Sequence, residues 1–431
     1  MKVLLVGDGA REHIIAEQLA RSCEAYVAME KRNPGIESSV QKVFVCDFSN
    51  IEAIGGWAVR ENIDIALVTS EEALARGLSD ALTDIGIAVA SPPSAGSEIG
   101  ENTVYAFNLM ETAGIAIPRL AVCKNEQDLK KAVGEMKKVI MKPAVRVEWK
   151  GARFSESDFR KKDDMIKRGN ELIKRHGSVV LEEPVDGERF SVQAMTDGKT
   201  ISVMPPVHTA RRALDGNGGE LTEGMGSYSA GRLLPFMKQS DFDYARDCLS
   251  KLVATMRGKG IEYRGAICGQ FIAARKGPVM VDVYATLGDM ETLNNLMLLR
   301  TQFVEVLNSV IEGKLIQTSF MERATVVKYV VPEKYPEKAK KKERITIEER
   351  VLWDNGAKAY VDSLELKKDK ILLTNERAVA ICTSGATVEE AEAKAEGATT
   401  SIGGKVRHRK DIATKEYLEK SMKHMAMVRA V

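Results

Sequence analysis

Residues that hold metal ions through nitrogen or sulfur are scarce in this chain of 431 residues. There are five histidines, none spaced for joint metal ligation with another. The six cysteines are scattered and include no Cys-x-x-Cys pair. This pattern argues against a zinc site and against a disulfide framework, and it is typical of a reducing compartment.

The chain also lacks a long apolar run and a strong charge of either sign. No apolar run approaches the ~20 residues that a membrane span needs. The N-terminus runs directly into a short strand and a glycine loop, unlike a signal peptide. The net charge of +2 gives no electrostatic footprint for nucleic acid, and the lysine-rich stretch 338–342 reads as a solvated loop. We therefore expect a cytoplasmic protein that binds neither membrane nor nucleic acid.

What is present is an ordinary globular composition, 44% hydrophobic and 29% charged, in a chain too long for a single core. Short apolar runs alternate with helical patterns over the first ~95 residues, which predicts right-handed crossovers and a doubly wound parallel sheet. Mixed sheets with helices follow, and the last part reads as a small α+β domain. We expect an α/β and α+β protein with four segments: 1–95, 96–195, 196–324 and 325–431.

Longer elements can be predicted from helical periodicity and from glycine and proline positions. Single helices are expected at 98–113, 239–259, 290–313 and 388–398. The glycine-rich segment Asp215 to Gly226 is expected to be a mobile, functional loop, because connections of that length are rarely without a role.

Two adjacent strands joined at Lys276 and Gly277 carry the most informative polar residues. The first strand places Gln270 among apolar neighbours, and the second does the same with Asp282. Buried polar side chains are costly unless something binds them, and both offer oxygen ligands suited to Mg²⁺. A pair of ordinary strands with satisfied polar side chains explains this segment equally well.

Two further groups suit a nucleotide. Lys142 and Lys150 flank one connection and could supply point charges for polyphosphate. Glu182, Glu183 and Glu188 surround a turn after a strand, where they could bind an adenine amino group and ribose hydroxyls. Solvated lysines and an acidic hinge loop remain the simpler explanations of these two groups.

The opening GDGAREH, at residues 7–13, follows a strand and begins a helix whose N-terminus could receive an anion. It lacks the third glycine of a dinucleotide-binding fingerprint, because Glu12 stands there. A tight strand–helix turn without a ligand accounts for the segment as well.

The order of these groups along the chain resembles an ATP-grasp ligase. More narrowly, the whole chain resembles the glycinamide ribonucleotide synthetase (phosphoribosylamine–glycine ligase) family. GDGAREH resembles that family's glycine-rich start, GMGSYS at 224–229 and LGDMET at 287–292 its loops, and RHRKDIAT at 407–414 its closing strand. The resemblance implies a Rossmann-like N-terminal substrate domain, a two-part ATP-grasp unit with a nucleotide-binding lobe and then a metal and catalytic lobe, and a small C-terminal α+β domain.

The resemblance implies ATP-dependent ligation of glycine to 5-phosphoribosylamine through glycyl phosphate, with ATP and Mg²⁺ (or Mn²⁺) as cofactors. It implies a monomer or weak homodimer acting on small molecules in purine synthesis. The roles carried over are ATP phosphates for Lys142 and Lys150, the adenine edge for Glu182 and Glu183, the ribose for Glu188, and the metal for Gln270 and Asp282. Asp282 and Arg212 are the catalytic candidates, and Gly9, Arg11 and Asp289 are expected to face phosphoribosylamine.

Several positions depart from the family's pattern. Residues 144–149 read AVRVEW where the family has a glycine-rich phosphate loop, and Thr103 replaces a lysine. Asp282 and Tyr284 stand where the family has Glu-x-Asn. Two alternatives therefore stay open: a non-catalytic relative that binds nucleotide or a purine-pathway partner, and a ligase with a different substrate.

Overall fold

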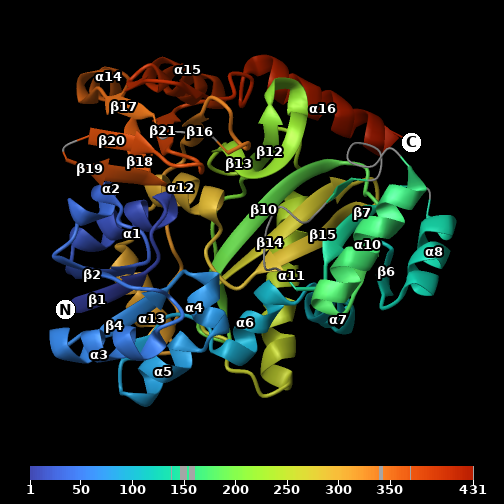
Figure 1. Ribbon diagram of the computed structural model, residues 1–431, viewed down its shortest axis with the longest axis horizontal. Helices are drawn as coiled ribbons and strands as arrows, with labels where there is room; N and C mark the ends of the chain where they lie inside the picture. The colour runs from blue at the N-terminus through green and yellow to red at the C-terminus, as the bar shows by residue number, and fades with distance from the viewer. Residues whose placement is uncertain (137, 146–152, 155–160, 339–342, 369, 431) are drawn as a thin grey trace.

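The computed structural model describes residues 1–136, 138–145, 153–154, 161–338, 343–368 and 370–430, and it contains five sheets (Figure 1). The N-terminal elements lie on one side, and the lobe built from the described parts of residues 120–182 lies on the opposite side. The C-terminal elements lie above the N-terminal ones in this view, and the long strands β10 (Glu188–Thr196), β14 (Gly265–Ala274) and β15 (Gly277–Tyr284) run between the two sides.

The N-terminal sheet is parallel, with strand order β3-β2-β1-β4-β5, as the alternating pattern predicts. Alternate residues of β1 face two cores: Val3 and Leu5 pack on the side of Ile14, and Leu4 and Val6 on the side of Trp57. The strands are β1 (Lys2–Val6), β2 (Glu24–Met29), β3 (Lys42–Val45), β4 (Ile65–Val68) and β5 (Ala88–Val89). The helices are α1 (Ala10–Ala20), α2 (Pro34–Glu37), α3 (Ile51–Glu61), α4 (Glu71–Ala75) and α5 (Leu78–Asp84).

Two of the expected long helices are each broken into two. The helix predicted at 98–113 is α6 (Ser94–Glu101) followed by α7 (Thr103–Thr112). Asn102 has extended backbone angles, and its side chain accepts a hydrogen bond from the Tyr105 N–H, which starts a new helix. The helix predicted at 290–313 is likewise α12 (Asp289–Leu298) and α13 (Phe303–Ile311).

The lobe on the opposite side has a four-stranded sheet of order β6-β9-β7-β8, with α8 and α10 packed together against it. The elements are β6 (Leu120–Cys123), α8 (Glu126–Glu135), β7 (Ile140–Pro143), β8 (Arg153–Phe154), α10 (Lys162–His176) and β9 (Val179–Glu182).

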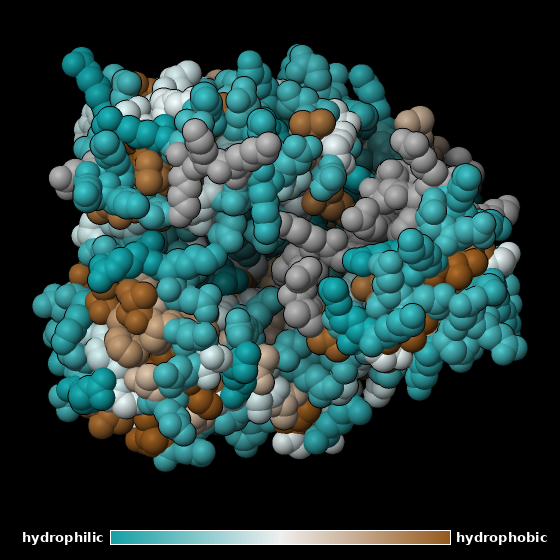
Figure 2. Space-filling model, viewed as in Figure 1, coloured by the Kyte–Doolittle hydropathy of each residue, from teal (hydrophilic) through white to brown (hydrophobic). Residues whose placement is uncertain are grey.

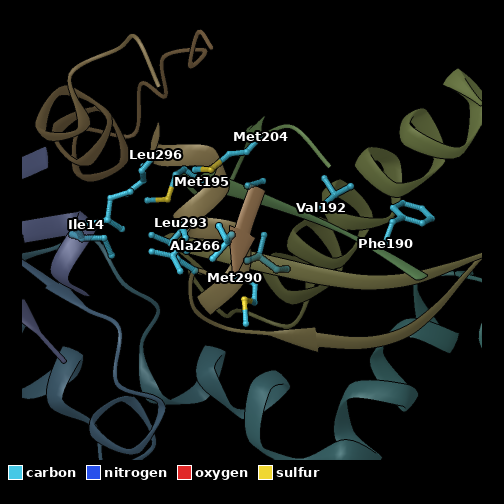
Figure 3. Packing of buried hydrophobic residues seen from close by; sticks show 14 of the residues in the cluster. Ile14, Phe190, Val192, Met195, Met204, Ala266, Met290, Leu293 and Leu296 are labelled. Carbon is cyan, nitrogen blue, oxygen red and sulfur yellow. The ribbon is translucent and has the colours of Figure 1, made fainter. Parts of the chain in front are cut away.

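The central sheet, of order β11-β10-β14-β15, is antiparallel and carries the predicted pair of strands. Helix α12 joins it to the N-terminal domain: its Leu293 and Leu296 lie between Ile14 of α1 and the central-sheet residues Met195 and Ala266 (Figure 3). The strands are β10 (Glu188–Thr196), β11 (Ile201–Val203), β14 (Gly265–Ala274) and β15 (Gly277–Tyr284), and α11 (Gln239–Gly258) packs on β14 and β15.

The predicted mobile loop at 215–226 is wrong. Only the turn at Asp215–Asn217 is irregular, and the rest belongs to strand β13 (Gly218–Ser229), which pairs with β12 (His208–Leu214) and β16 (Ala324–Pro332). The glycines serve close packing: a Cβ on Gly226, which has φ +159, would lie 2.4 Å from the Val327 carbonyl oxygen. Glycine enrichment therefore marks a crowded strand here.

Strands β12 and β13 extend into a sheet of order β12-β13-β16-β21-β18, with β23 pairing on β16. A second C-terminal sheet has the order β19-β20-β17-β22 and contains a hairpin in which Lys367 pairs with Lys370. The remaining elements are β17 (Arg344–Ile347), α14 (Glu349–Asp354), β18 (Lys358–Val361), β19 (Leu364–Lys367), β20 (Lys370–Leu373), β21 (Val379–Gly385), α15 (Val388–Thr399), β22 (Ile402–Gly403) and β23 (Val406–Arg407). The last helix, α16 (Lys415–Ala430), was not expected from the sequence.

Hydrophilic side chains cover most of the face in Figure 2, and hydrophobic ones form small separate patches on it. Among the residues described, no helix has both the length and the apolar character required to cross a membrane.

Candidate active site

A first cavity of about 350 Å³ opens between the lobe of β7 and the central sheet. Residues of β7, β10, β12, β15 and α16 line it. Its lining is strongly basic, with Lys142 on β7, Arg189 on β10, and Arg211 and Arg212 on β12. Four cations converging on one cavity favour an anion with several negative charges, such as a polyphosphate.

Lys142, proposed to contact phosphate, lines this cavity. Its ammonium lies 2.6 Å from Glu182 Oε2, donates a hydrogen bond to the Val281 carbonyl at 2.9 Å, and sits over the Phe107 ring. Both charged side chains are shielded from solvent, with exposed fractions of 14% for Lys142 and 1% for Glu182. The two side chains thus form a shielded ion pair at the wall of the cavity.

Arg189 was not foreseen from the sequence. Burial and the neighbouring charge of Arg211 lower the pKa of its guanidinium, which is the expected effect of crowding cations together. An anion placed between Arg189 and Arg211 would relieve this repulsion. In the sequence, Arg189 is simply an arginine after an acidic segment. An arginine in that position can equally well lie on the surface or in a cavity.

The three acids proposed for adenine and ribose lie in different surroundings. Glu182 is buried against Lys142, and Glu183 forms a surface ion pair with Arg119 at 3.2 Å. Neither is among the described residues that line the cavity, whereas Glu188 is. Lys150 lies outside the described residues. Arg212 lines the cavity and donates to the Gly219 carbonyl at 2.8 Å.

Asp282 and Gln270 are direct partners in the register of β15 and β14, as the two-strand pattern predicts. Asp282 lines the first cavity, and the Tyr284 hydroxyl lies 3.4 Å from its Oδ2. Gln270 lines a second cavity and donates its amide to Glu291 Oε1 at 3.0 Å. Within the described ranges, no three His, Cys, Asp or Glu side chains gather as a metal cluster. One cavity carboxylate fits the mode in which Mg²⁺ arrives with nucleotide phosphates and keeps few protein ligands.

The second cavity, of about 330 Å³, lies between the N-terminal domain, α12 and the C-terminal domain. Its lining is rich in acids, which include Asp8, Glu71, Glu223, Asp289 and Asp362, and it also contains Arg11 and Arg377. Gly9, Arg11 and Asp289, proposed to face phosphoribosylamine, all line this cavity. The structure therefore brings together three residues that are up to 280 positions apart in the chain.

Side chains already fill the expected anion position at the start of α1. The Ala10 N–H donates to Asp362 Oδ1 at 3.0 Å, and the Gly9 N–H donates to Glu12 Oε2 at 2.8 Å. Burial raises the pKa of Asp362 to about 7, and Arg377 opposes that rise. Arg11 is held in place by the carbonyl oxygens of Leu287 and Thr69.

Arg377 is the central cation of the second cavity and was also missed in the sequence. Its guanidinium lies 2.6 Å from Asp289, 3.1 Å from Asp362 and 4.1 Å from the centre of the Tyr329 ring. It follows β20 in a short turn, where arginine gives no local sign of burial. Only the packing of the C-terminal domain against α12 places it at the site.

Thr209 and Arg211 line both cavities, so the two cavities adjoin at β12. A group bound in the basic cavity and a group bound in the acidic cavity would therefore face each other across Arg211. This geometry suits transfer between a phosphorylated donor and an acceptor with an amine.

The parallel N-terminal domain, the two lobes that enclose a basic cavity and the carboxylate on a central strand define a member of the ATP-grasp class. Family models for phosphoribosylglycinamide synthetase match along the chain: the N domain at residues 1–100, the ATP-grasp (A) domain at 101–292 and the C domain at 325–415. The chain belongs to the phosphoribosylglycinamide synthetase family.

Known relatives agree with this placement. The phosphoribosylamine–glycine ligase of Methanobrevibacter smithii is 34% identical over 99% of both chains. The crystal structure of the Thermotoga maritima phosphoribosylamine–glycine ligase superposes with a TM-score of 0.81 at 21% identity, over 95% of this chain and 100% of that one. The biotin carboxylase domain of Hydrogenobacter thermophilus 2-oxoglutarate carboxylase, solved with MgADP, has a TM-score of 0.72 at 14% identity over 98% of both chains. The family and fold expected from the sequence are confirmed.

Proposed function

We propose that this protein ligates glycine to 5-phosphoribosylamine at the expense of ATP, giving glycinamide ribonucleotide, ADP and phosphate. The observation that carries the proposal is the junction of a basic cavity with an acidic one at Arg211. Full-length relatives named as this ligase support it, and the solved relative with MgADP supports ATP and magnesium as cofactors.

The first cavity is the proposed ATP site. Lys142, Arg189 and Arg212 neutralise the polyphosphate, and Glu188 at the cavity wall accepts hydrogen bonds from the ribose hydroxyls. The Glu182 side chain holds the Lys142 ammonium in position. The proposed contact with adenine would therefore come from the backbone of the acidic segment that begins at Glu182. Glu183 and Lys150 keep their proposed roles beside the adenine and the phosphates.

Asp282 would hold Mg²⁺ together with the nucleotide phosphates. Gln270, its register partner on β14, keeps its proposed role as the second metal ligand. When bound, the ion neutralises charge on the phosphoryl group during transfer. Arg211 and Arg212, which lie on the same strand, stabilise the negative charge that develops between the two cavities.

The second cavity is the proposed acceptor site. The glycine carboxylate attacks the γ-phosphorus, and the bond to the ADP oxygen breaks, giving glycyl phosphate. The amine of phosphoribosylamine then attacks the acyl carbon, phosphate leaves, and the amine loses a proton. Gly9, Arg11 and Asp289 position phosphoribosylamine, and a carboxylate of this acidic cavity accepts the proton that the attacking amine loses.

The decisive experiment supplies purified protein with ATP, Mg²⁺, glycine and freshly made phosphoribosylamine. Mass spectrometry is expected to detect glycinamide ribonucleotide, with phosphate released only when both glycine and the amine are present. Protein that binds ATP but makes no product would refute the ligase assignment and favour a non-catalytic relative.

We further propose that the protein works in the cytoplasm as a monomer or weak homodimer without nucleic acid, and that its domains divide near residues 95, 195 and 324. The scattered cysteines and the net charge of +2 support the first part of this proposal. Light scattering after size exclusion measures the oligomeric state.

A further inference from the structure

The C-terminal helix α16 leaves the C-terminal domain and runs along the upper edge of the molecule toward the opposite lobe (Figure 1). The family's C-domain model ends at residue 415, where this helix begins. Tyr417, near its start, lines the basic cavity, and its hydroxyl lies 2.9 Å from His208 Nε2 in that same cavity. The helix therefore forms part of the cavity wall.

The far end of α16 is anchored on the central part of the chain. Arg429 lies 2.5 Å from Asp241 at the start of α11 and donates to the Phe236 carbonyl at 3.2 Å. Because the Arg429 and Asp241 side chains are largely buried, this ion pair fixes the direction of the helix. The residues between Tyr417 and Arg429 are thus held over one edge of the nucleotide cavity.

His424 lies between these two anchors and uses both ring nitrogens. Its Nδ1 lies 2.6 Å from Glu188 Oε1, and its Nε2 lies 3.1 Å from Asp186 Oδ1. Two carboxylates on opposite edges of one imidazole fit the doubly protonated ring, in which both nitrogens donate. The ring is therefore oriented by two acids and in turn orients them.

Glu188 lies between the basic cavity and a further cavity beside α16. It lines the basic cavity and also a cavity of about 810 Å³ along α16, which His424 lines as well. Its Oε1 is engaged by His424, while its Oε2 has no hydrogen-bond partner among the described residues. A carboxylate held by one oxygen presents the other to a ligand in a defined direction.

We propose that α16 belongs to the nucleotide site and that His424 is a positioning residue, which holds Glu188 in the orientation that recognises the ribose hydroxyls of the nucleotide. This inference rests on the proposed function, in which Glu188 binds the ribose. Asp186 binds the other edge of the ring. The contacts therefore run from Asp186 at the protein surface through His424 to Glu188 at the cavity.

The chain offers a matched pair of variants. The amide nitrogen of asparagine coincides with the position of Nδ1, and that of glutamine with Nε2. His424→Asn can therefore still donate to Glu188, whereas His424→Gln can donate only to Asp186. His424→Ala removes both donors, and Lys423→Ala, which loses only an exposed ion pair with Glu419, is the control on the same helix.

Calorimetric titration with Mg·ATP and with Mg·2′,3′-dideoxy-ATP tests the proposal. The wild type is expected to prefer ATP. His424→Ala and His424→Gln are expected to lose roughly 2- to 12-fold of that preference, while His424→Asn and Lys423→Ala keep it. In steady-state assays the loss appears in KM for ATP with little change in kcat, which a general loss of structure would not produce.

Two results would overturn the inference in distinguishable ways. If the wild type binds ATP and His424→Ala discriminates between the nucleotides equally well, or if His424→Asn behaves like His424→Gln, His424 does not position Glu188 and the proposed function stands. If the wild type binds no ATP, the proposed function and the inference fail together.

Discussion

Arg377 and Asp289 form a 2.6 Å ion pair between the C-terminal domain and the first turn of α12. Arg377 is almost completely buried, and Asp362 also contacts its guanidinium. The pair joins the turn after β20 to the helix whose buried face packs on α1. One arginine thus connects the C-terminal domain, α12 and the acceptor cavity.

Removing this cation should be costly. We expect Arg377→Met to lower the free energy of unfolding by about 3–5 kcal/mol, because it leaves the shielded Asp362 and the partly exposed Asp289 carboxylates without their cation. Urea unfolding measures the change. Arg323→Met, at an exposed arginine outside both cavities, is the control, and a loss below about 1 kcal/mol for Arg377→Met would contradict the prediction.

Lys142 should dominate the affinity for nucleotide. Lys142→Ala removes a charge-assisted contact worth ~1.5–3 kcal/mol and leaves buried Glu182 facing the phosphates, so ATP binding should weaken roughly 10- to 150-fold. Calorimetric titration checks this. Lys130→Ala, which breaks only a surface pair with Glu126, should leave the affinity unchanged. Equal affinities for both variants would place the phosphates elsewhere.

Tyr284 is expected to weaken the metal site. Its neutral phenol beside Asp282 is a poor ligand, whereas an amide oxygen is a suitable hard ligand for Mg²⁺. Tyr284→Asn together with Asp282→Glu should therefore lower the Mg²⁺ concentration for half-maximal ATP cleavage or raise the rate. Tyr284→Phe removes the hydroxyl without adding a ligand and should not lower it. An unchanged magnesium requirement in the double variant would count against Asp282 as the metal ligand.

The hairpin of β12 and β13 should be rigid before nucleotide binds. Arg409 is fully buried, donates to the Arg212 carbonyl and pairs with Asp411, whose carboxylate accepts the Gly216 N–H. We expect slow hydrogen exchange over 218–229 with and without Mg·ATP. Arg409→Met should speed exchange at 213–217 specifically. Fast exchange throughout the wild-type hairpin would restore the idea of a mobile lid.

His424 should give α16 a pH-dependent attachment. The hydrogen bond that His424 donates to Glu188 raises the pKa of His424, burial opposes that rise, and the hydrogen bond to Asp186 adds to it. A folded pKa above the unfolded value of ~6.5 means that the stabilisation is complete below that pH and is lost as pH rises through the folded pKa. The difference in unfolding free energy between wild type and His424→Ala should therefore be largest near pH 5 and shrink toward pH 9. A difference that grows with pH would show that the neutral ring binds better.

Much of the fold follows from local patterns. The parallel N-terminal sheet, the β14–β15 pair with Gln270 opposite Asp282, and α11 and α15 all arise where periodicity and turn residues agree. The errors have local causes as well. Asn102 ends one helix and caps the next inside an apolar pattern, and the glycines before Ser227 fit a crowded strand although they resemble those of a loop.

The sequence by itself determined the class of fold, the order of the elements and a set of polar residues placed along it in a family's order. Lys142 and Asp282 could be chosen because each lies on a recognisable strand, and Glu188 because it ends an acidic turn. Only the tertiary structure decided that Arg189, Arg377 and His424 reach the cavities. Their positions depend on packing between segments far apart in the chain, such as His424 against Glu188 across 236 residues, and no local spacing records a contact of that kind.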